Sequence, residues 1–306
     1  MPYAAGAPRN NAMSPFHIFL AVMVAAIFGF GFVPSKIGVA SYPPLWFLAV
    51  RFALVSLFLL WFIRVPRGQW RAVLVFALIM GIGHFSLSYL GMKAGAEASL
   101  AALLWVMQAP ISAALALVFL GERMHWRGIA GLLLAIVGAV VLLGEPRHIG
   151  NYLGIALVGG SAVLGAVANI LGKRLGAVEP LTLQGWSALV ALPVLVALSF
   201  IFEEGQIAGL VNAPWEAHGS LLYLVFLSSM LGYGTYWWLL KRYTVATTVS
   251  IFLMVPAFGA AGGVAVLGDA FTWQSGLGAA GMLGGVALLM VRRERAAKTA
   301  PVNPES

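Results

Sequence analysis

Long apolar windows without a charged residue follow one another along almost the whole chain. A helix that crosses a bilayer needs about 20 apolar residues, because the hydrocarbon core is about 30 Å thick. Nine such windows contain no Asp, Glu, Lys or Arg, and a tenth, from Pro44 to Ile63, contains only Arg51. The sequence therefore predicts an all-α membrane protein with ten transmembrane helices. The nine windows are residues 17–35, 72–92, 98–121, 128–144, 149–172, 180–202, 219–240, 243–268 and 270–291.

The composition indicates that lipid is the main solvent of this chain. Of its 306 residues, 61% are hydrophobic and 9% are charged, whereas soluble domains carry about 25% charged residues. Ten spans with short connections use nearly the whole length and leave no stretch for a soluble catalytic domain. The chain has no cysteine, which excludes disulfides, thiolate nucleophiles and thiolate metal sites. We expect no metal and no cofactor.

The basic residues divide unevenly between the two sides that ten crossings would create. Three of them, Lys36, Lys93 and Arg147, fall on one side, and fourteen fall on the other. Under the positive-inside rule, the side with fourteen is cytoplasmic, and so are both termini. The net charge of +8 then reflects cytoplasmic loops, and we expect no nucleic-acid partner. The fourteen are Arg9, Arg64, Arg67, Arg71, Arg123, Arg127, Lys173, Arg174, Lys241, Arg242, Arg292, Arg293, Arg295 and Lys298.

The two halves of the chain carry the same short features in the same order. Lys36 precedes Pro43 by seven residues, and Lys173 precedes Pro180 by the same separation. Because each half holds five predicted spans, an odd number, the second half must enter the membrane in the opposite sense. Many secondary transporters are built from inverted repeats of this kind. The other matched pairs are Tyr89 and Tyr236, Pro110 and Pro256 after a one-residue slip, Gly121-Glu122 and Gly268-Asp269, Trp126 and Trp273, Gly131 and Gly278, and Gly138 and Gly285.

These matches divide the chain into two repeats, residues 13–144 and 149–291, with cytoplasmic tails at residues 1–12 and 292–306. The first span could also be a cleaved secretory leader, for which Ile37-Gly38-Val39-Ala40 offers a weak cleavage site. The first span has a partner in the second half, however. We therefore expect it to be retained.

With these features, the chain resembles an EamA-type member of the drug/metabolite transporter superfamily across residues 13–291. The residues that carry the resemblance are Gly29-Phe30-Gly31 through Lys36, Arg51-Phe52, Gly121-Glu122-Arg123 and the glycine-rich fifth and tenth helices. Met107-Gln108-Ala109-Pro110 is also similar to the cysteine and O-acetylserine exporters of bacteria within that family.

The family implies ten helices around a central cavity, alternating access, and export of amino acids or related metabolites. The two halves of this chain depart from one another, because Ala188 stands where Arg51 would map and Ala270 stands opposite Arg123. For that reason, the substrate of a similar family member cannot be assigned to this chain.

Two ionisable residues inside predicted spans are candidate substrate contacts. Such groups are unfavourable in lipid and usually face a cavity. His84 lies well inside the third span, although a neutral histidine bonded to a neighbouring helix is the alternative interpretation. Arg51 could hold a substrate carboxylate through two parallel hydrogen bonds, or its long side chain could reach the external interface.

Uncharged residues complete the candidate cavity. Gln108 offers two donors and an acceptor, and Pro110 and Pro256 are predicted to kink their helices. The alternative for Gln108 is a hydrogen bond that holds helices together, and the alternative for the aromatic residues is an interfacial belt. The remaining candidates are Tyr89, Trp105, Asn169, Gln184, Trp186 and Tyr236.

The sequence thus predicts a secondary transporter that exports amino acids or similar small metabolites across the plasma membrane, most simply a bacterial inner membrane. Its expected partners are the small-molecule substrate and membrane lipid, and the fifth and tenth helices are a candidate supporting or dimerising pair, which allows a homodimer. Two rival classes share the topology: a flippase or exporter of lipid-linked or other amphiphiles, and a channel. An enzyme is disfavoured, because no carboxylate pair lies deep in a span and no phosphate-binding loop is present.

Overall fold

The computed structural model describes residues 13–64, 68–119, 126–144, 151–175, 178–242 and 254–299, and the regular elements in these ranges are all helical. Three apolar helices are shorter, Ala98–Ser112, Gly128–Leu143 and Val255–Leu267. Five helices are long and apolar enough to cross a membrane: Pro15–Ser41, Pro44–Phe62, Trp70–Lys93, Tyr152–Gly172 and Leu181–Phe202. Each of these eight stretches overlaps one of the predicted windows.

The first half of the chain forms helices whose ends follow from local sequence. Pro15 and Pro44 lie in the first turn of their helices, where a proline gives up no helical hydrogen bond. The Ser14 hydroxyl accepts a 3.3 Å bond from the His17 amide and so caps the first helix. The elements are α1 (Pro15–Phe30), α2 (Phe32–Ser41), α3 (Pro44–Leu59), the 3₁₀ turn η1 (Leu60–Phe62), α4 (Trp70–Ala77), the π-helical segment η2 (Leu78–His84), α5 (Phe85–Lys93), α6 (Ala98–Trp105), α7 (Gln108–Phe119) and α8 (Trp126–Leu143).

The second half repeats one irregularity of the first. When Tyr89 is aligned with Tyr236, the π-helical segment η2 falls inside the π-helical segment η4, on the matched span. π-helical turns are rare and are frequent at functional sites. The elements of this half are α9 (Tyr152–Arg174), α10 (Pro180–Phe202), α11 (Gln206–Asn212), α12 (Trp215–Leu222), η4 (Tyr223–Gly232), α13 (Tyr233–Arg242), α15 (Val255–Gly262), the π-helical segment η5 (Gly263–Leu267) and α16 (Trp273–Thr299).

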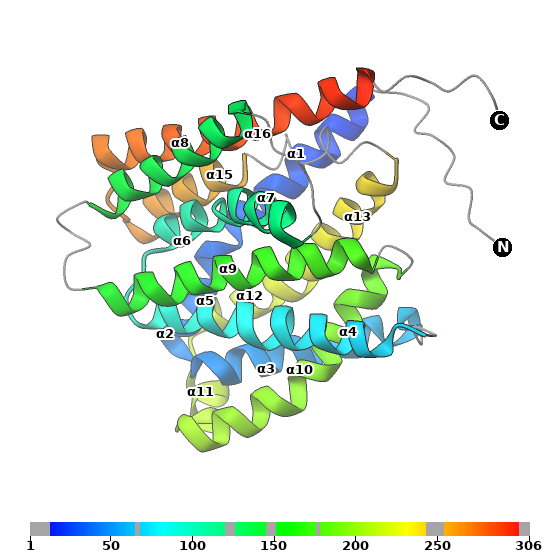
Figure 1. Ribbon diagram of the computed structural model, residues 1–306. Helices are drawn as coiled ribbons and strands as arrows, with labels where there is room; N and C mark the ends of the chain where they lie inside the picture. The colour runs from blue at the N-terminus through cyan, green and yellow to red at the C-terminus, as the bar shows by residue number, and fades with distance from the viewer. Residues whose placement is uncertain are drawn as a thin grey trace.

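The helices α8 and α16 form one closely packed pair at the edge of the bundle (Figure 1). A Cβ atom placed on Gly138 would lie 2.7 Å from the Gly278 carbonyl oxygen, and one placed on Gly285 would contact Gly131. In the repeat, Gly131 matches Gly278, and Gly138 matches Gly285. Gly138 therefore contacts the residue that matches Gly131, and Gly131 contacts the residue that matches Gly138. A two-fold axis between antiparallel helices produces this exchange of contacts. The glycine-lined faces of α8 and α16 therefore pack against each other within one chain.

A second set of small residues brings three spans together at the centre. A Cβ atom on Gly29 would lie 2.9 Å from the Gly259 amide nitrogen, and Gly259 also lies against Ala102, so α1, α15 and α6 approach closely. Small residues permit such backbone contact between membrane helices. α3 packs on α10, α5 on α9, and α2 on α12, which surrounds this centre with further helices.

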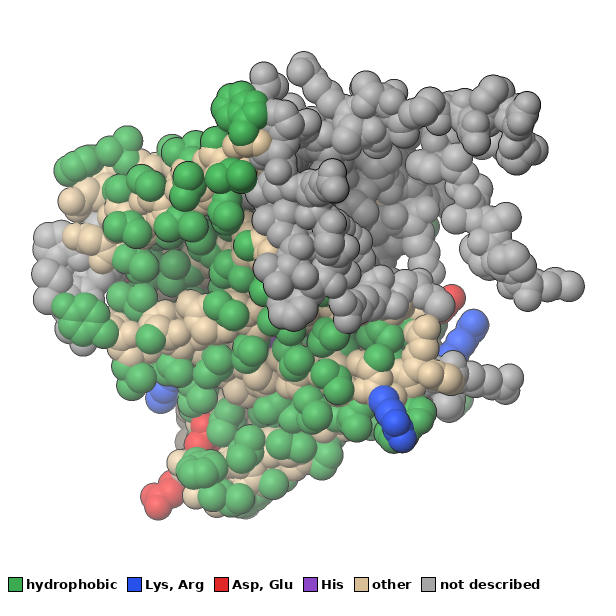
Figure 2. Space-filling view, in the orientation of Figure 1, with side chains coloured by type: hydrophobic (Ala, Val, Ile, Leu, Met, Phe, Trp, Pro, Cys, Tyr) green, Lys and Arg blue, Asp and Glu red, His purple; other side chains and the backbone are tan. Residues whose placement is uncertain are grey.

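The described surface is mostly apolar. Figure 2 shows apolar side chains over most of the described part of this face, with few charged side chains among them. The first residues of α1 and the last residues of α16 lie at the same end of the bundle (Figure 1). Trp61, Phe202 and Val211 are among the large apolar side chains that remain exposed. Such a surface suits lipid and not water.

Candidate functional site

A narrow cavity of about 80 Å³ lies between helices from both halves of the chain. Four of the nine predicted side chains line this central cavity: Arg51, His84, Tyr89 and Trp105. The other lining residues are Phe28, Gly31, Phe32, Ser35, Phe85, Ser88, Met92, Leu224, Ser228, Tyr233 and Val255. None of these eleven is among the nine candidates predicted from the sequence.

Helical periodicity could have found several of the missed residues. Along α5, Phe85, Ser88, Tyr89 and Met92 follow the i, i+3, i+4, i+7 spacing that places side chains on one helix face. Tyr89 was already a candidate, so its neighbours at that spacing were available from the sequence. The same spacing relates Phe28, Gly31, Phe32 and Ser35 along α1 and α2.

The Arg51 guanidinium is buried against the cavity wall, with 2% of the residue exposed. It donates hydrogen bonds to the Tyr89 hydroxyl at 2.6 Å and to the Ser229 hydroxyl at 3.1 Å. Its Cζ atom lies 5.1 Å from the centre of the Phe85 ring, within the range of a cation–π contact. Arg51 Nε has no hydrogen-bond partner within the described ranges. Among the described residues, no carboxylate forms an ion pair with this guanidinium.

His84 ends the π-helical segment η2 and joins it to α9. Its Nδ1 atom lies 2.8 Å from the Ser161 carbonyl oxygen and 2.9 Å from the Ser161 hydroxyl. A carbonyl oxygen only accepts, so this contact assigns the proton of the neutral ring to Nδ1. Nε2 is then the acceptor that the ring offers to the cavity that His84 lines. His84 therefore bonds to a neighbouring helix and also lines the cavity, so both interpretations from the sequence describe it.

Three of the remaining candidates lie between helices away from the described cavity lining. The Gln108 amide packs on α9, where a Cβ atom on Gly165 would lie 2.6 Å from Gln108 Cδ. Asn169 is exposed and donates a 3.3 Å bond to the Ser112 hydroxyl. Gln184 is buried on α10. The amide nitrogens of Gln108 and Gln184 have no hydrogen-bond partner in the described part of the chain.

Two aromatic candidates also lie outside the lining of the cavity. Trp186 donates from Nε1 to the Arg64 carbonyl oxygen at 3.0 Å and thereby joins α10 to the end of the second span. The Tyr236 ring packs edge-on against Phe28, with 6.3 Å between the ring centres. A polar or aromatic residue in a span can face a cavity, a neighbouring helix or an interface, and the sequence does not distinguish these.

Each predicted kink proline lies in the first turn of a helical segment. The fourth span is interrupted at Val106 and Met107, whose amides donate to the third residue before them, and α7 with Pro110 begins immediately after. Pro110 cannot donate the amide hydrogen bond that would continue α6 across this point. Pro256 lies in the first turn of α15, and the residues that precede Met254 lie outside the described ranges.

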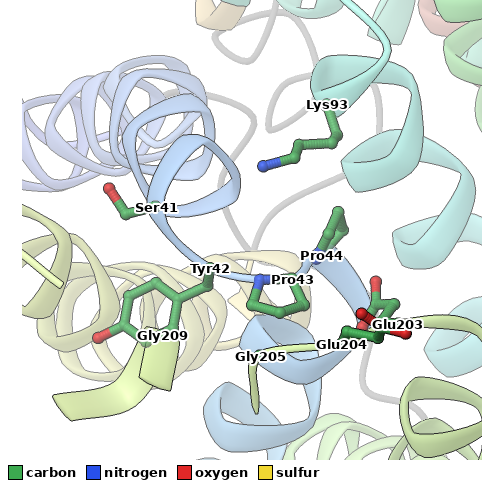
Figure 3. A pocket seen from close by; sticks show the side chains of 9 residues that line it. All are labelled: Ser41, Tyr42, Pro43, Pro44, Lys93, Glu203, Glu204, Gly205 and Gly209. Atoms are coloured by element: carbon green, nitrogen blue, oxygen red, sulfur yellow. The ribbon is translucent and has the colours of Figure 1, made fainter. Parts of the chain in front are cut away.

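A wider pocket of about 410 Å³ lies at the ends of α2, α5 and α10 (Figure 3). We call it the peripheral pocket. Figure 3 shows the Lys93 side chain on one side and Glu203 and Glu204 on another, with Pro43 and Pro44 between them. The remaining lining residues are Ser41, Tyr42, Gly205 and Gly209.

Two hydrogen-bonded groups shape the peripheral pocket. The Glu203 carboxylate accepts from the amides of Leu45 and Trp46 at 2.9 and 3.1 Å, which satisfies the amino-terminal end of α3. The Tyr42 hydroxyl lies 2.6 Å from His218 Nδ1 on α12. Burial raises the pKa of Tyr42, so its hydroxyl stays protonated.

Comparisons with known proteins agree with this arrangement. Residues 15–144 and 152–291 each match the EamA-like transporter family. The chain is 31% identical to a probable amino-acid metabolite efflux pump of Salmonella typhimurium, over 88% of this chain and 92% of that protein. It is 30% identical to the protein of the same description in Escherichia coli, over 85% and 90%.

A more distant relative and a solved structure extend the comparison. A probable terminal-alkyne amino-acid exporter of Streptantibioticus cattleyicolor is 29% identical over 63% of this chain and 64% of its own. One crystal structure shares the fold with a TM-score of 0.65 and 17% identity, covering 92% of this chain and 97% of the solved one. The chain therefore belongs to the EamA-like transporter family and is a multi-pass membrane protein that transports small molecules.

Proposed function

We propose that this protein exports small zwitterionic metabolites, amino acids above all, across a bacterial plasma membrane by alternating access. The observation that carries the proposal is the Arg51 guanidinium, which is buried at the central cavity without a carboxylate among the described residues. The relatives from Salmonella typhimurium and Escherichia coli, described as probable amino-acid metabolite efflux pumps, support the same substrate class.

A buried cation without a counter-ion is unfavourable by several kcal/mol. Two hydroxyl partners, Tyr89 and Ser229, compensate this only in part. A substrate carboxylate that takes both terminal nitrogens would supply the missing charge in the geometry that guanidinium prefers. The cavity thus favours a ligand with an anionic group over a neutral amphiphile or a simple cation.

His84 supplies the complementary half of a zwitterion site. With Nδ1 held by Ser161, Nε2 can accept a hydrogen bond from the ammonium group of a substrate. Ser35, Ser88 and Ser228 add hydroxyl groups to the same wall. Arg51 and His84 together therefore suit a molecule that carries a carboxylate and an amine.

The size of the cavity supports a mechanism with more than one conformation. At about 80 Å³ it is smaller than the roughly 300–1,000 Å³ of ordinary ligand pockets, so helices must separate before substrate enters. Two repeats of opposite orientation, ten crossings and cytoplasmic termini would supply two such conformations. Tags at both ends should then be reached by a probe only from the cytoplasmic side.

Counterflow in proteoliposomes tests the transport function. Vesicles are loaded with one unlabelled amino acid at a time, and uptake of the labelled compound is measured. Only a carrier accumulates label against a gradient of unlabelled substrate. Arg51→Met should strongly reduce accumulation at low substrate concentration. Asn169→Ala, a change outside the cavity lining, should retain accumulation. Flux that does not saturate would indicate a channel, and activity with lipid-linked substrates alone would indicate a flippase.

A further inference from the structure

A buried aromatic ring contacts one lining residue of the peripheral pocket and one of the central cavity. Phe47 is fully buried and lines neither space. It stacks on Tyr42, which lines the peripheral pocket, with ring centres 5.2 Å apart and an interplanar angle of 29°. It also packs on Tyr89, which lines the central cavity, at 5.7 Å and 31°.

Two helices run from one space to the other beside this ring. Along α5, Met92 lines the central cavity and the next residue, Lys93, lines the peripheral pocket. Along α2, Ser35 lines the cavity and Ser41 lines the pocket. The two spaces are therefore neighbours, separated over this short distance by side chains.

We propose that the peripheral pocket is the exit of the transport pathway, that Phe47 is the gate between it and the central cavity, and that substrate opens this gate by taking Arg51 from Tyr89. The inference rests on the proposed function for the direction of transport. The contacts of Phe47 with Gly38, Tyr42 and Tyr89 do not depend on the direction of transport.

The closed position of Phe47 depends on a glycine. A Cβ atom on Gly38 would lie 2.7 Å from Phe47 Cε2 and would also overlap the rest of the ring edge. The ring therefore seats directly against the backbone of α2, without a gap. Tyr42, which stacks on the ring, is held in turn by His218 of the second repeat. Gate closure thus involves α2, α3 and α12 together.

Arg51 would couple the gate to the substrate, because the guanidinium proposed to bind a substrate carboxylate also donates to Tyr89. Arg51 Nη1 donates to the Tyr89 hydroxyl, and Nη2 donates to Ser229. Each terminal nitrogen carries a second N–H, but a carboxylate is a charged acceptor that competes with these neutral hydroxyls and draws the guanidinium toward the cavity. Tyr89 then loses the hydrogen bond that fixes its ring against Phe47.

The peripheral pocket has the size and charge of a release site. Its volume of about 410 Å³ falls in the usual range of ligand pockets, roughly 300–1,000 Å³. Lys93 and Glu204 present charges of both signs to it, and Glu204 has no ion-pair partner among the described residues. A small zwitterion could leave the cavity through this space without meeting a wholly apolar surface.

Thiol labelling tests the gate without any substrate. The chain has no cysteine, so Ser88→Cys places a single thiol in the central cavity. A membrane-impermeant thiol reagent is added to intact cells and, separately, to inside-out vesicles, and a permeant reagent measures the total thiol. Adding Phe47→Ala should speed labelling at least 10-fold from one side only, the side of the peripheral pocket.

The matched control is Phe58→Ala, which removes the same group from a lipid-facing position on α3 that packs against Phe226. It should leave the labelling rate unchanged. If Phe47→Ala labels as slowly as the parent while its thermal unfolding is unchanged, the gate assignment is wrong. Equal acceleration by Phe58→Ala would show general loosening and would overturn it too.

Tyr89→Phe tests the coupling step, because it keeps the ring and removes the bond to Arg51. It should speed labelling several-fold in the Ser88→Cys background, and it should add nothing when Arg51→Met is already present. A gate that opens in Phe47→Ala but not in Tyr89→Phe would refute the coupling to Arg51. Failure of counterflow with normal gate labelling would refute the transport proposal alone.

Discussion

The Arg51 guanidinium and the Tyr89 hydroxyl, 38 residues apart in the sequence, meet in a hydrogen bond of 2.6 Å beside the central cavity. The other terminal nitrogen of Arg51 reaches Ser229, 178 residues away in the second repeat. One side chain therefore joins α3 to α5 and to η4. A ligand that draws this guanidinium into the cavity would therefore disturb a contact between the two repeats.

Arg51→Met should separate stability from transport. A hydrophobic side chain of similar length removes the buried charge, which can stabilise a protein by about 1–4 kcal/mol. The same change should weaken apparent substrate affinity about 10- to 150-fold, because a charge-assisted hydrogen bond contributes about 1.5–3 kcal/mol. Thermal unfolding in detergent and counterflow measure the two effects. A variant that unfolds at a lower temperature than the parent would show that the charge is structural.

The two ring nitrogens of His84 should have separable roles. In His84→Asn, the amide nitrogen can replace Nδ1 as donor to Ser161, but no acceptor replaces Nε2 in the cavity. This variant should keep parental stability and raise the half-saturation concentration about 10-fold, the effect of one hydrogen bond. His84→Gln should lose about 1 kcal/mol of stability and keep a polar group near the cavity. The opposite ranking of the two variants would contradict the assigned tautomer.

Neighbouring glycines of α16 should respond differently to alanine. In Gly285→Ala, the new Cβ would lie 2.6 Å from the Ala135 amide nitrogen of α8, which is backbone and cannot rotate away. Overpacking of this kind costs about 1–3 kcal/mol. In Gly284→Ala, the nearest atom is Leu134 Cδ2 at 3.8 Å, an ordinary contact. Unfolding temperatures of the two variants in one detergent provide the comparison, and equal values would disprove close packing of α8 on α16.

Glu203 and Glu204 should differ in their effect on stability. Both oxygens of Glu203 accept amide hydrogen bonds at the start of α3, and Oε2 also accepts from the Ser199 hydroxyl at 2.8 Å. Glu203→Ala should therefore reduce stability by about 0.5–2 kcal/mol, as loss of a helix cap does. Glu204→Ala should be neutral, because Glu204 is exposed and bonds to no described residue. A destabilised Glu204→Ala with a normal Glu203→Ala would reverse the assignment.

The sequence predicted the features that depend on local composition. A membrane span needs length and apolarity in one continuous segment, so the windows could be read without any tertiary contact. A charge inside a span is unfavourable wherever the helix packs, and this reasoning led to Arg51 and His84. The glycine pairs of α8 and α16 were also visible, because the repeat placed them at matched positions.

The tertiary structure alone decided which uncharged residues face the cavity. Gln108, Gln184 and Trp186 resembled cavity residues in sequence, but an amide or an indole bonds equally well to a neighbouring helix. Ser35 shares a helical face with Phe28, but the spacing did not tell which face meets the cavity, and its hydroxyl donates to the Gly31 carbonyl oxygen at 2.8 Å. The stack of Tyr42, Phe47 and Tyr89 joins residues of three elements, and only the packing of those elements could create it.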